Sequence, residues 1–300
     1  MTSKEMLDKC IMCPHKCGAD RTNGKTGVCK ATDKIKVALV STHNYEEPCI
    51  SGTKGSGTIF FTGCNLKCVY CQNHEISSGM FGKEITIERL AEIMLEQQAR
   101  GVLNINLVTP TMYALQIKEA IILAKEKGLS IPIVYNSGGY ENVEVLKELD
   151  GYIDIYLPDL KYINDESARK YSNAPNYFEH ATEAILEMRR QVKDNIDEDG
   201  IMKSGLVIRH MILPNMVENT KGILKWIKDN LGEEQIISIM AQYFPTHKAM
   251  EYEEINRKIT KEELEEVEDY IFELGLENGY IQELGEHEEE YVPNFNLDNV

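Results

Sequence analysis

From about Gly57 onward, short apolar runs rich in β-branched residues alternate with longer segments of helical period. The predicted strands are Thr58–Thr62, Leu103–Val108, Ile131–Tyr135, Tyr152–Leu157, Leu206–Leu213 and Ile236–Ala241. The helical segments are Ile87–Gln98, Ala114–Lys127, Asn142–Leu149, Phe178–Val192 and Lys221–Asn230. Strands that alternate with helices are typical of a parallel sheet. The pattern predicts an α/β fold, either an open doubly wound sheet or a partly closed barrel.

The two ends of the chain differ from this middle region. Residues 1–50 carry four cysteines and turn signals but no long apolar period, which predicts a small module held together by metal. Near the other end, Thr260 and Glu263 form a capping box for a last helix that Gly275 ends. The predicted organisation is a cysteine-rich metal-binding module over 1–50, an α/β region over 51–280 and an acidic tail without a function over 281–300.

Composition excludes several classes of function. The chain of 300 residues is 42% apolar and has a formal charge of −17, which argues against nucleic-acid binding because phosphate contacts need a basic face. No run approaches the roughly 18 consecutive apolar residues of a membrane helix, and the start, MTSKEMLDKC, lacks the apolar core of a signal peptide. We therefore expect a cytoplasmic protein with no membrane partner.

The eight cysteines all lie in the first quarter of the chain. In a cytoplasmic protein, cysteines are expected to serve metal or redox chemistry rather than disulfide bonds. Cys64, Cys68 and Cys71 have CxxxCxxC spacing directly after the first predicted strand. Structural zinc and electron-carrying four-iron clusters take four protein ligands. Three cysteines instead leave one iron of such a cluster open. A closed zinc site that borrows a fourth cysteine is the less favoured alternative.

A second group consists of Cys10, Cys13, Cys17 and Cys29. Four soft ligands so close in sequence are typical of a tetrathiolate zinc site. A second iron–sulfur cluster is the competing interpretation, although the spacing is not that of the ferredoxins. Cys49 has no partner at motif spacing, and we expect a small buried or incidental thiol there.

With Tyr70, the Cys64–Cys71 loop resembles the signature of the radical S-adenosylmethionine (radical SAM) enzymes. Further segments, including IPIVYNSGGY, YLPDLKY and IRHMILPN, resemble the branch related to pyruvate formate-lyase activating enzyme. The resemblance implies a partial (β/α)6 barrel, a 4Fe-4S cluster on the three thiolates, and S-adenosylmethionine chelated to the fourth iron. One electron, from a donor such as flavodoxin or ferredoxin, would then yield a 5′-deoxyadenosyl radical that abstracts hydrogen from a substrate.

Three kinds of function remain open at this stage. The resemblance favours an oxidoreductase acting on a protein or peptide, for example as the activase of a glycyl-radical enzyme. The alternatives are radical modification of a peptide side chain or a small metabolite, and a non-catalytic electron-transfer or interaction protein. The last is disfavoured because electron transfer does not need an open iron.

The resemblance also implies a cofactor pocket at the ends of the predicted strands, without assigning a catalytic residue. Its members would be Tyr70, Thr109, Asn136, Ser137, Asp159, Lys161 and Arg209. Thr109 stands where many members carry Gly-Gly-Glu to hold the methionyl amine, so Thr109 or Thr111 hydroxyls or backbone carbonyls would have to substitute. Tyr70 would lie near the adenine, and Asn136 and Ser137 suit ribose or methionyl contacts. The alternative for Asn136 is a simple turn with the glycines that follow it.

Asp159 and Lys161 match the Asp-x-Lys of the activating enzymes and point to the same side of a strand end. Arg209 would clamp the methionyl carboxylate with two parallel donors. A surface ion pair is the alternative for Asp159 and Lys161. We expect His210 to be a buried core histidine, whereas His247 lies near the barrel mouth, where a substrate or cofactor role is conceivable.

Overall fold

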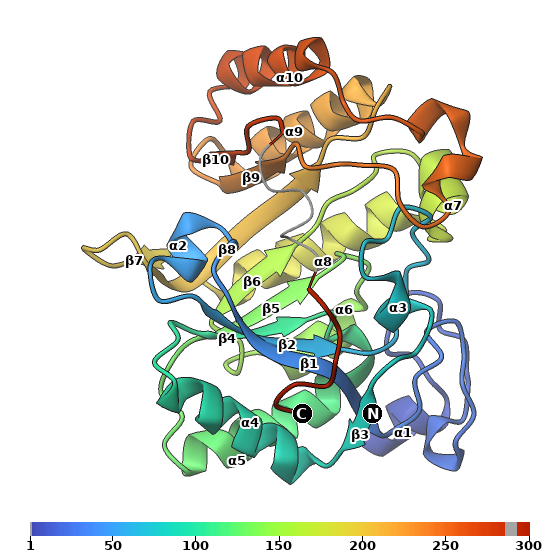
Figure 1. Cartoon of the computed structure of the whole chain (residues 1–300), viewed down its shortest axis with the longest axis vertical. Helices are drawn as coiled ribbons and strands as arrows, with labels where there is room; N and C mark the ends of the chain where they lie inside the picture. Colours follow the sequence, from blue (N-terminus) through green and yellow to red (C-terminus); the bar gives the residue numbers. More distant parts are fainter. Residues whose placement is uncertain (1, 286–292) are drawn as a thin grey trace.

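The computed structural model describes residues 2–285 and 293–300, and its centre is one curved sheet (Figure 1). The strands are β1 (Ile35–His43), β2 (Ser56–Phe61), β3 (Lys83–Ile85), β4 (Ile105–Val108), β5 (Ile133–Ser137), β6 (Ile155–Pro158), β7 (Asn195–Ile196), β8 (Met202–Met211), β9 (Ile236–Met240) and β10 (Gly279–Ile281). They are ordered β10-β9-β8-β6-β5-β4-β2-β1-β3, and β7 pairs with β8.

All six predicted strands are present, as β2, β4, β5, β6, β8 and β9, and they pair in parallel in that order. The predicted fold class, a partial α/β barrel, is therefore confirmed. Because the strands run the same way, their carboxyl ends meet at one mouth, where parallel barrels bind their ligands. β10 adds to β9 in parallel, whereas β1 and β3 are antiparallel additions at the other edge.

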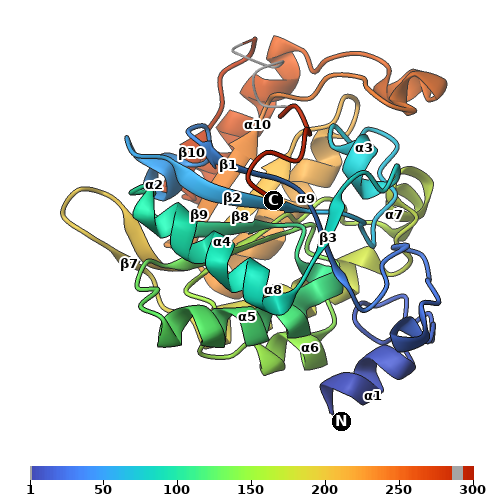
Figure 2. The same ribbon diagram turned by 60° about the horizontal axis from the view of Figure 1, so that its bottom comes forward.

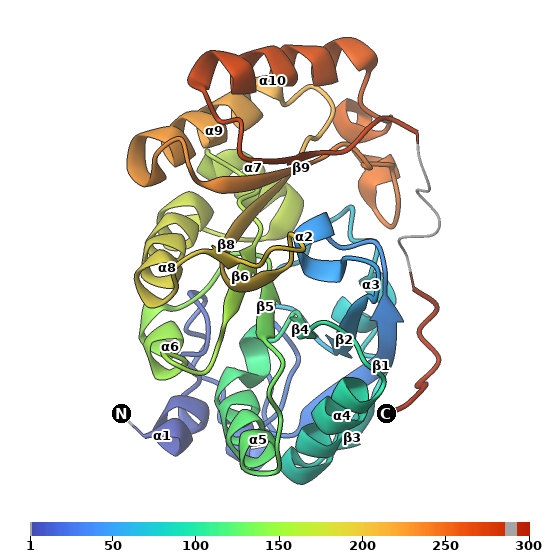
Figure 3. The same ribbon diagram turned by 90° about the vertical axis from the view of Figure 1, so that its left-hand side faces the viewer.

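The described residues form ten α-helices, several of which pack on the outer face of the sheet (Figure 3). They are α1 (Ser3–Asp8), α2 (Pro48–Ser51), α3 (His74–Ser77), α4 (Ile87–Ala99), α5 (Ala114–Glu126), α6 (Val143–Glu148), α7 (Asp165–Ser172), α8 (Tyr177–Gln191), α9 (Val217–Leu231) and α10 (Lys261–Leu274). The predicted capping box of Thr260 and Glu263 begins α10, and Gly275 ends it in the left-handed conformation. No helix in the described part of the chain is long and apolar enough to cross a membrane.

Strand β1 and helix α2 give the barrel a floor. β1 runs antiparallel to β2, so that His43 lies beside Ser56 at the start of β2. The chain then turns inward through residues 44–47, here called the β1–α2 connection. Cys49 and Ile50 of α2 pack inside the barrel against residues of β5, β6, β8 and β9. Cys49 is thus a buried core thiol, and α2 fills the amino-terminal end of the barrel.

The N-terminal segment lies beside the loop that follows β2 (Figure 2). His15 Nε2 lies 2.9 Å from the backbone oxygen of Asn65, and Asn142 donates to the backbone oxygen of Ile11 at 2.6 Å. The cysteine-rich segment is therefore docked on both the CxxxCxxC loop and the loop after β5. Since β1 belongs to the main sheet, residues 35–43 are structurally continuous with it, and the domain boundary at residue 50 stays a prediction.

The C-terminal residues 293–300 run along β1. Leu297 donates to the backbone oxygen of Ala38 and Val40 to that of Asp298, while the Phe295 ring packs on Phe60 at 5.6 Å between centroids. These contacts fix the end of the chain against the barrel edge. Glu286, Glu288, Glu289 and Glu290 of the predicted acidic tail lie outside the described residues.

Candidate active site

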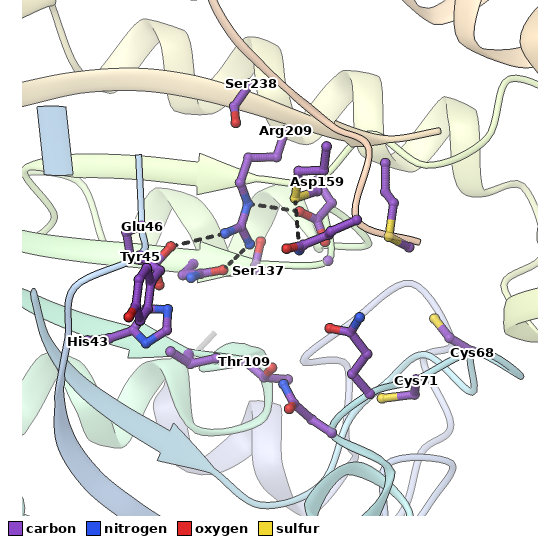
Figure 4. Close-up of a pocket in the computed structure, with 18 of the residues that line it drawn as sticks. His43, Tyr45, Glu46, Cys68, Cys71, Thr109, Ser137, Asp159, Arg209 and Ser238 are labelled. Atoms are coloured by element: carbon purple, nitrogen blue, oxygen red, sulfur yellow. Dashed lines mark hydrogen bonds and ion pairs between the residues drawn. The ribbon is translucent and has the colours of Figure 1, made fainter. Parts of the chain in front are cut away.

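A cavity of about 520 Å³ opens at the carboxyl ends of the parallel strands (Figure 4). Every pocket residue and loop cysteine expected from the sequence lines it: Cys64, Cys68, Tyr70, Cys71, Thr109, Asn136, Ser137, Asp159, Lys161 and Arg209. They come from the loop after β2 and from the ends of β4, β5, β6 and β8. The fold therefore gathers residues that are up to 145 positions apart, from Cys64 to Arg209, around one cavity.

The three loop cysteines are partly exposed to this cavity, and each sulfur has a hydrogen-bonding neighbour. Cys64 Sγ accepts from the backbone N–H of Leu66 at 3.4 Å, Cys68 Sγ from the Ser172 hydroxyl at 3.0 Å, and Cys71 Sγ lies 3.3 Å from the Ser77 hydroxyl. Hydrogen bonds to cysteine sulfurs are one of the means by which a protein tunes an iron–sulfur cluster. Three thiols facing one cavity and supported in this way fit a cluster with one open iron.

Burial governs the protonation of these thiols in the protein alone. It raises the pKa of Cys64 to about 12 and that of Cys71 to about 11. A coordinating metal reverses this preference because it binds the thiolate. In a four-iron cluster each cysteine binds a different iron, so the sulfurs need not converge on one point.

A chain of hydroxyl groups runs from the pocket wall to one sulfur. The Tyr70 and Tyr162 hydroxyls are 2.5 Å apart, Tyr162 is 2.7 Å from the Ser172 hydroxyl, and Ser172 donates to Cys68. Burial raises the pKa of both tyrosines well above the ordinary value, so they are neutral. Tyr70 thus lines the pocket, and its hydroxyl belongs to the series of hydrogen bonds that ends at Cys68.

Arg209 is the centre of the polar network across the barrel. Its guanidinium donates to Asp159 at 3.1 Å, to Asn136 at 2.5 Å and to Glu46 at 3.3 Å. Burial opposes its charge, but the carboxylates of Asp159, Glu47 and Glu46 outweigh burial and raise its pKa. Because its donors are bound by acceptors of the chain itself, the role of Arg209 as a direct clamp for a cofactor carboxylate stays a prediction.

Asp159 is held between two cations. Lys161 Nζ lies 2.6 Å from one oxygen and Arg209 binds the other. Burial alone would raise the pKa of Asp159, but Lys161 and Arg209 lower it, so the carboxylate is ionised. The pair is not an exposed surface ion pair, because the Asp159 and Lys161 side chains are only 14% and 16% exposed.

Sequence reasoning did not identify Glu46 and Glu47, which enter the cavity from the β1–α2 connection. Asn106 Nδ2 donates to Glu46 at 2.9 Å, and the Ser238 hydroxyl hydrogen-bonds Glu47. Burial raises the pKa of both carboxyls. The antiparallel direction of β1 brings both residues under the barrel mouth. The apolar run over residues 37–40 is the sequence pattern from which this strand could have been predicted.

At the end of β4, Thr109 has a φ of +59°, a conformation that is costly for a β-branched residue and is concentrated at functional sites. Thr109 lines the cavity, whereas the Thr111 hydroxyl donates to the buried Glu141 at 2.5 Å and does not line it. Burial raises the pKa of Glu141 to about 7. Of the two threonines, Thr109 is therefore the one placed to contact a ligand.

Comparison with known protein families identifies the family of this chain. The model of the radical SAM superfamily matches residues 58–227, from β2 to α9. The chain belongs to the radical SAM superfamily. It is an enzyme, and its cofactors are a 4Fe-4S cluster and S-adenosylmethionine, for which the three cysteines and the cavity beside them provide the fitting donor set and space.

The chain is also similar to individual proteins. An uncharacterised protein of Methanocaldococcus jannaschii, MJ0674, is 33% identical over 88% of this chain and 74% of its own length. The pyruvate formate-lyase-activating enzyme of Clostridium pasteurianum is 24% identical over 72% of this chain and 90% of its own length. Among solved structures, Streptococcus suis SuiB bound to precursor peptide SuiA matches with a TM-score of 0.49 and 15% identity, over 73% of this chain and 46% of SuiB.

Two histidines near the radical SAM barrel behave differently. His210 is buried, with Nδ1 at 2.6 Å from the Leu160 backbone oxygen and Nε2 at 2.9 Å from the Thr220 hydroxyl. Burial lowers its pKa to about 4, which confirms the expected neutral core histidine. The His247 ring stacks on His74 at 4.7 Å and does not line the cavity.

The N-terminal cysteines are not part of the radical SAM cavity. Cys10, Cys13 and Cys29 are buried and Cys17 is exposed. Burial raises the pKa of Cys13, with smaller contributions from nearby Cys29 and Cys10. Within residues 2–285 and 293–300, no three side chains of His, Cys, Asp or Glu are arranged to hold a single metal ion. The zinc or second cluster at this group therefore stays a proposal based on its donor set.

Proposed function

We propose that this radical SAM enzyme abstracts a hydrogen atom from a side chain or backbone position of a protein or peptide, in the manner of an activating enzyme. The observation that carries the proposal is the group of three partly exposed cysteines beside a cavity lined by the ends of β4, β5, β6 and β8. The relationship to pyruvate formate-lyase-activating enzymes supports a macromolecular substrate.

Within this proposal, Cys64, Cys68 and Cys71 hold the cluster, and Ser172 and Ser77 steady two of the sulfurs. When bound, the cluster and S-adenosylmethionine supply a radical able to abstract hydrogen. Tyr70, Thr109, Asn136, Ser137 and Asp159 with Lys161 form the wall that positions S-adenosylmethionine, and Arg209 fixes Asp159 and Asn136 in place.

The electron that starts the reaction would come from an acidic carrier protein such as flavodoxin or ferredoxin. Although the whole chain has a formal charge of −17, its first 36 residues contain eight basic and four acidic side chains. This segment lies directly beside the cluster loop, through the contact between His15 and Asn65. A basic face next to the cluster steers an acidic partner to it.

The N-terminal cysteines would hold zinc in this proposal. The backbone N–H of Cys10 donates to the backbone oxygen of Ala19, and the backbone N–H of Gly18 donates to the backbone oxygen of Cys10. Lys16 donates to Cys13 and closes a tight turn between the second and third cysteines. A metal would tie these turns together in a segment that has little core of its own.

The substrate class is tested by following hydrogen. An extract of cells grown on deuterated medium is separated into dialysable and non-dialysable fractions, and each is incubated anaerobically with the reconstituted enzyme, dithionite and S-adenosylmethionine. We expect deuterium to enter 5′-deoxyadenosine from the non-dialysable fraction, and not with the Cys68→Ala variant. Transfer from the dialysable fraction alone would contradict a protein substrate and establish a small metabolite instead.

A further inference from the structure

The floor of the cavity is acidic, and its origin is the β1–α2 connection rather than the strand ends. The charged side chains that line the cavity are Glu46, Glu47, Asp159, Lys161 and Arg209, together with His43. Burial lowers the pKa of His43, so its ring adds no charge at neutral pH. The cavity therefore holds three carboxyl groups and two cationic side chains, so one carboxyl group has no cation of its own.

The two cations are not shared equally among the three carboxyl groups. Asp159 is paired with both Lys161 and Arg209. Glu46 accepts from another nitrogen of the Arg209 guanidinium at 3.3 Å. Glu47 has no ion pair within 4 Å in the part of the chain that the structure describes. It is the carboxyl group left over once the charges of the cavity are paired.

Hydrogen bonding points to the same place. Glu47 is 8% exposed, and its Oε2 is buried without a hydrogen-bond partner among the described residues. A buried oxygen without a hydrogen-bond partner destabilises the folded protein. A carboxylate oxygen is an acceptor, so the group that would satisfy Glu47 Oε2 is a donor.

We propose that the floor formed by Glu46 and Glu47 binds a cationic nitrogen of the substrate, an ammonium or guanidinium group. A cation with several N–H donors would favour the ionised form of the buried Glu47 carboxyl and donate the hydrogen bond that its Oε2 lacks. This inference rests on the proposed function in taking the cavity as the substrate site, and it adds the chemical class of the group that is recognised.

The position of the floor suits a substrate group rather than the cofactor. The cysteines lie on the loop after β2, at the carboxyl ends of the strands, whereas the β1–α2 connection follows the pairing of His43 with Ser56 at the amino end of β2. Figure 4 shows Glu46 and His43 on the side of the cavity opposite Cys68 and Cys71. A group bound at the cysteines would lie at one side of the cavity, and the floor at the other side is where the end of a second molecule would bind.

The direct test is binding of n-butylammonium, which has the shape of a lysine side chain, to the anaerobically reconstituted enzyme by calorimetry. 1-Butanol serves as the uncharged probe of similar size. We expect n-butylammonium to bind about tenfold more tightly than 1-butanol, and Glu47→Gln, which keeps the shape and removes the charge, to abolish this preference. Glu277→Gln, an exposed glutamate on the outer surface, is the matched control and should bind like the wild type.

Equal affinity of the two probes for the wild-type enzyme, or an unchanged preference in a folded Glu47→Gln variant, would overturn the inference. Thermal unfolding verifies that the variant is folded, and Glu46→Gln gives a second test because it also removes one acidic group of the floor. A blocked pentapeptide with one central lysine identifies the source. Binding at least as tight as that of n-butylammonium indicates a protein side chain, and weaker binding indicates a free amine.

The outcome is separate from that of the proposed function. If the wild-type enzyme forms 5′-deoxyadenosine but does not prefer n-butylammonium, only the inference about the floor fails. If it binds n-butylammonium but forms no 5′-deoxyadenosine, the radical function fails and the floor remains a cation site.

Discussion

The two groups of cysteines lie side by side in the molecule but in different surroundings. Cys64, Cys68 and Cys71 are partly exposed on a loop that borders a cavity of about 520 Å³. Cys10, Cys13 and Cys29 are buried in turns of the N-terminal segment, and none of them lines that cavity. The number of ligands agrees with this difference, since three cysteines leave a position for a ligand and four do not.

The surroundings of a cysteine group, more than its spacing, therefore distinguish a catalytic role from a structural one. The loop after β2 is held by the barrel, with Lys67 and Val69 donating to the backbone oxygens of Ser172 and Tyr171 in α7. The N-terminal group instead sits on the outside of that loop through His15. We expect the first group to be required for chemistry and the second for the stability of its surroundings.

The largest effect is expected from Cys68→Ala. It should remove a cluster ligand and lower formation of 5′-deoxyadenosine by about 1,000-fold or more, whereas Cys13→Ala should keep most of the activity per folded molecule. Iron content and product by chromatography measure both. Comparable losses in the two variants would remove the distinction between the groups.

The next effect is expected in stability. If Cys10, Cys13, Cys17 and Cys29 hold zinc, Cys29→Ala should release it and lower the thermal midpoint by about 10 °C, because metal binding contributes directly to folding. Zinc counting and calorimetry make the measurement. An unchanged zinc content would show that these cysteines are not its ligands.

A smaller effect is expected at the pocket wall. Asp159→Asn keeps the shape but removes the charge that Lys161 and Arg209 pair with, so S-adenosylmethionine should bind about tenfold more weakly while the iron content stays constant. Equilibrium binding to the reconstituted protein measures this, and the exposed Asp269→Asn is the control. Equal affinities of the two variants would take Asp159 out of the pocket.

The smallest effect concerns the tuning of the cluster. Ser172→Ala removes the hydroxyl that donates to Cys68 Sγ at 3.0 Å, so the reduced, more negative cluster loses a stabilising contact and its potential should become more negative. A redox titration followed by electron paramagnetic resonance measures the change against Ser130→Ala, a serine on the outer surface. An unaltered potential would mean that this hydrogen bond is absent from the loaded enzyme.

The sequence predicted the parts of this structure that are periodic or compact in sequence. The six parallel strands, the capped helix α10 and the CxxxCxxC loop follow from local patterns, and the strand ends then converge by topology. The additions to the barrel were not predicted, because β1 falls in a segment whose cysteines and turns dominate the pattern. Glu46 and Glu47 were not predicted for the same reason, because their entry into the cavity depends on the direction in which the chain turns after His43.

The roles of individual pocket residues were harder to predict than their places. Arg209 reached the cavity as expected, but its partners Asp159, Asn136 and Glu46 come from three separate elements. Thr109 and Thr111 are two residues apart, yet only Thr109 faces the cavity because the chain enters a short helical turn after it. Such side-chain partners depend on tertiary packing that no local pattern contains.

The most direct measurement is anaerobic reconstitution with iron and sulfide, followed by counting of iron and zinc and a dithionite-driven assay for 5′-deoxyadenosine. We expect about four irons and one zinc per chain, with 5′-deoxyadenosine formed from S-adenosylmethionine. Eight irons would assign a second cluster to the N-terminal cysteines. Bound iron without any 5′-deoxyadenosine would contradict the central claim that the three-cysteine loop serves radical chemistry.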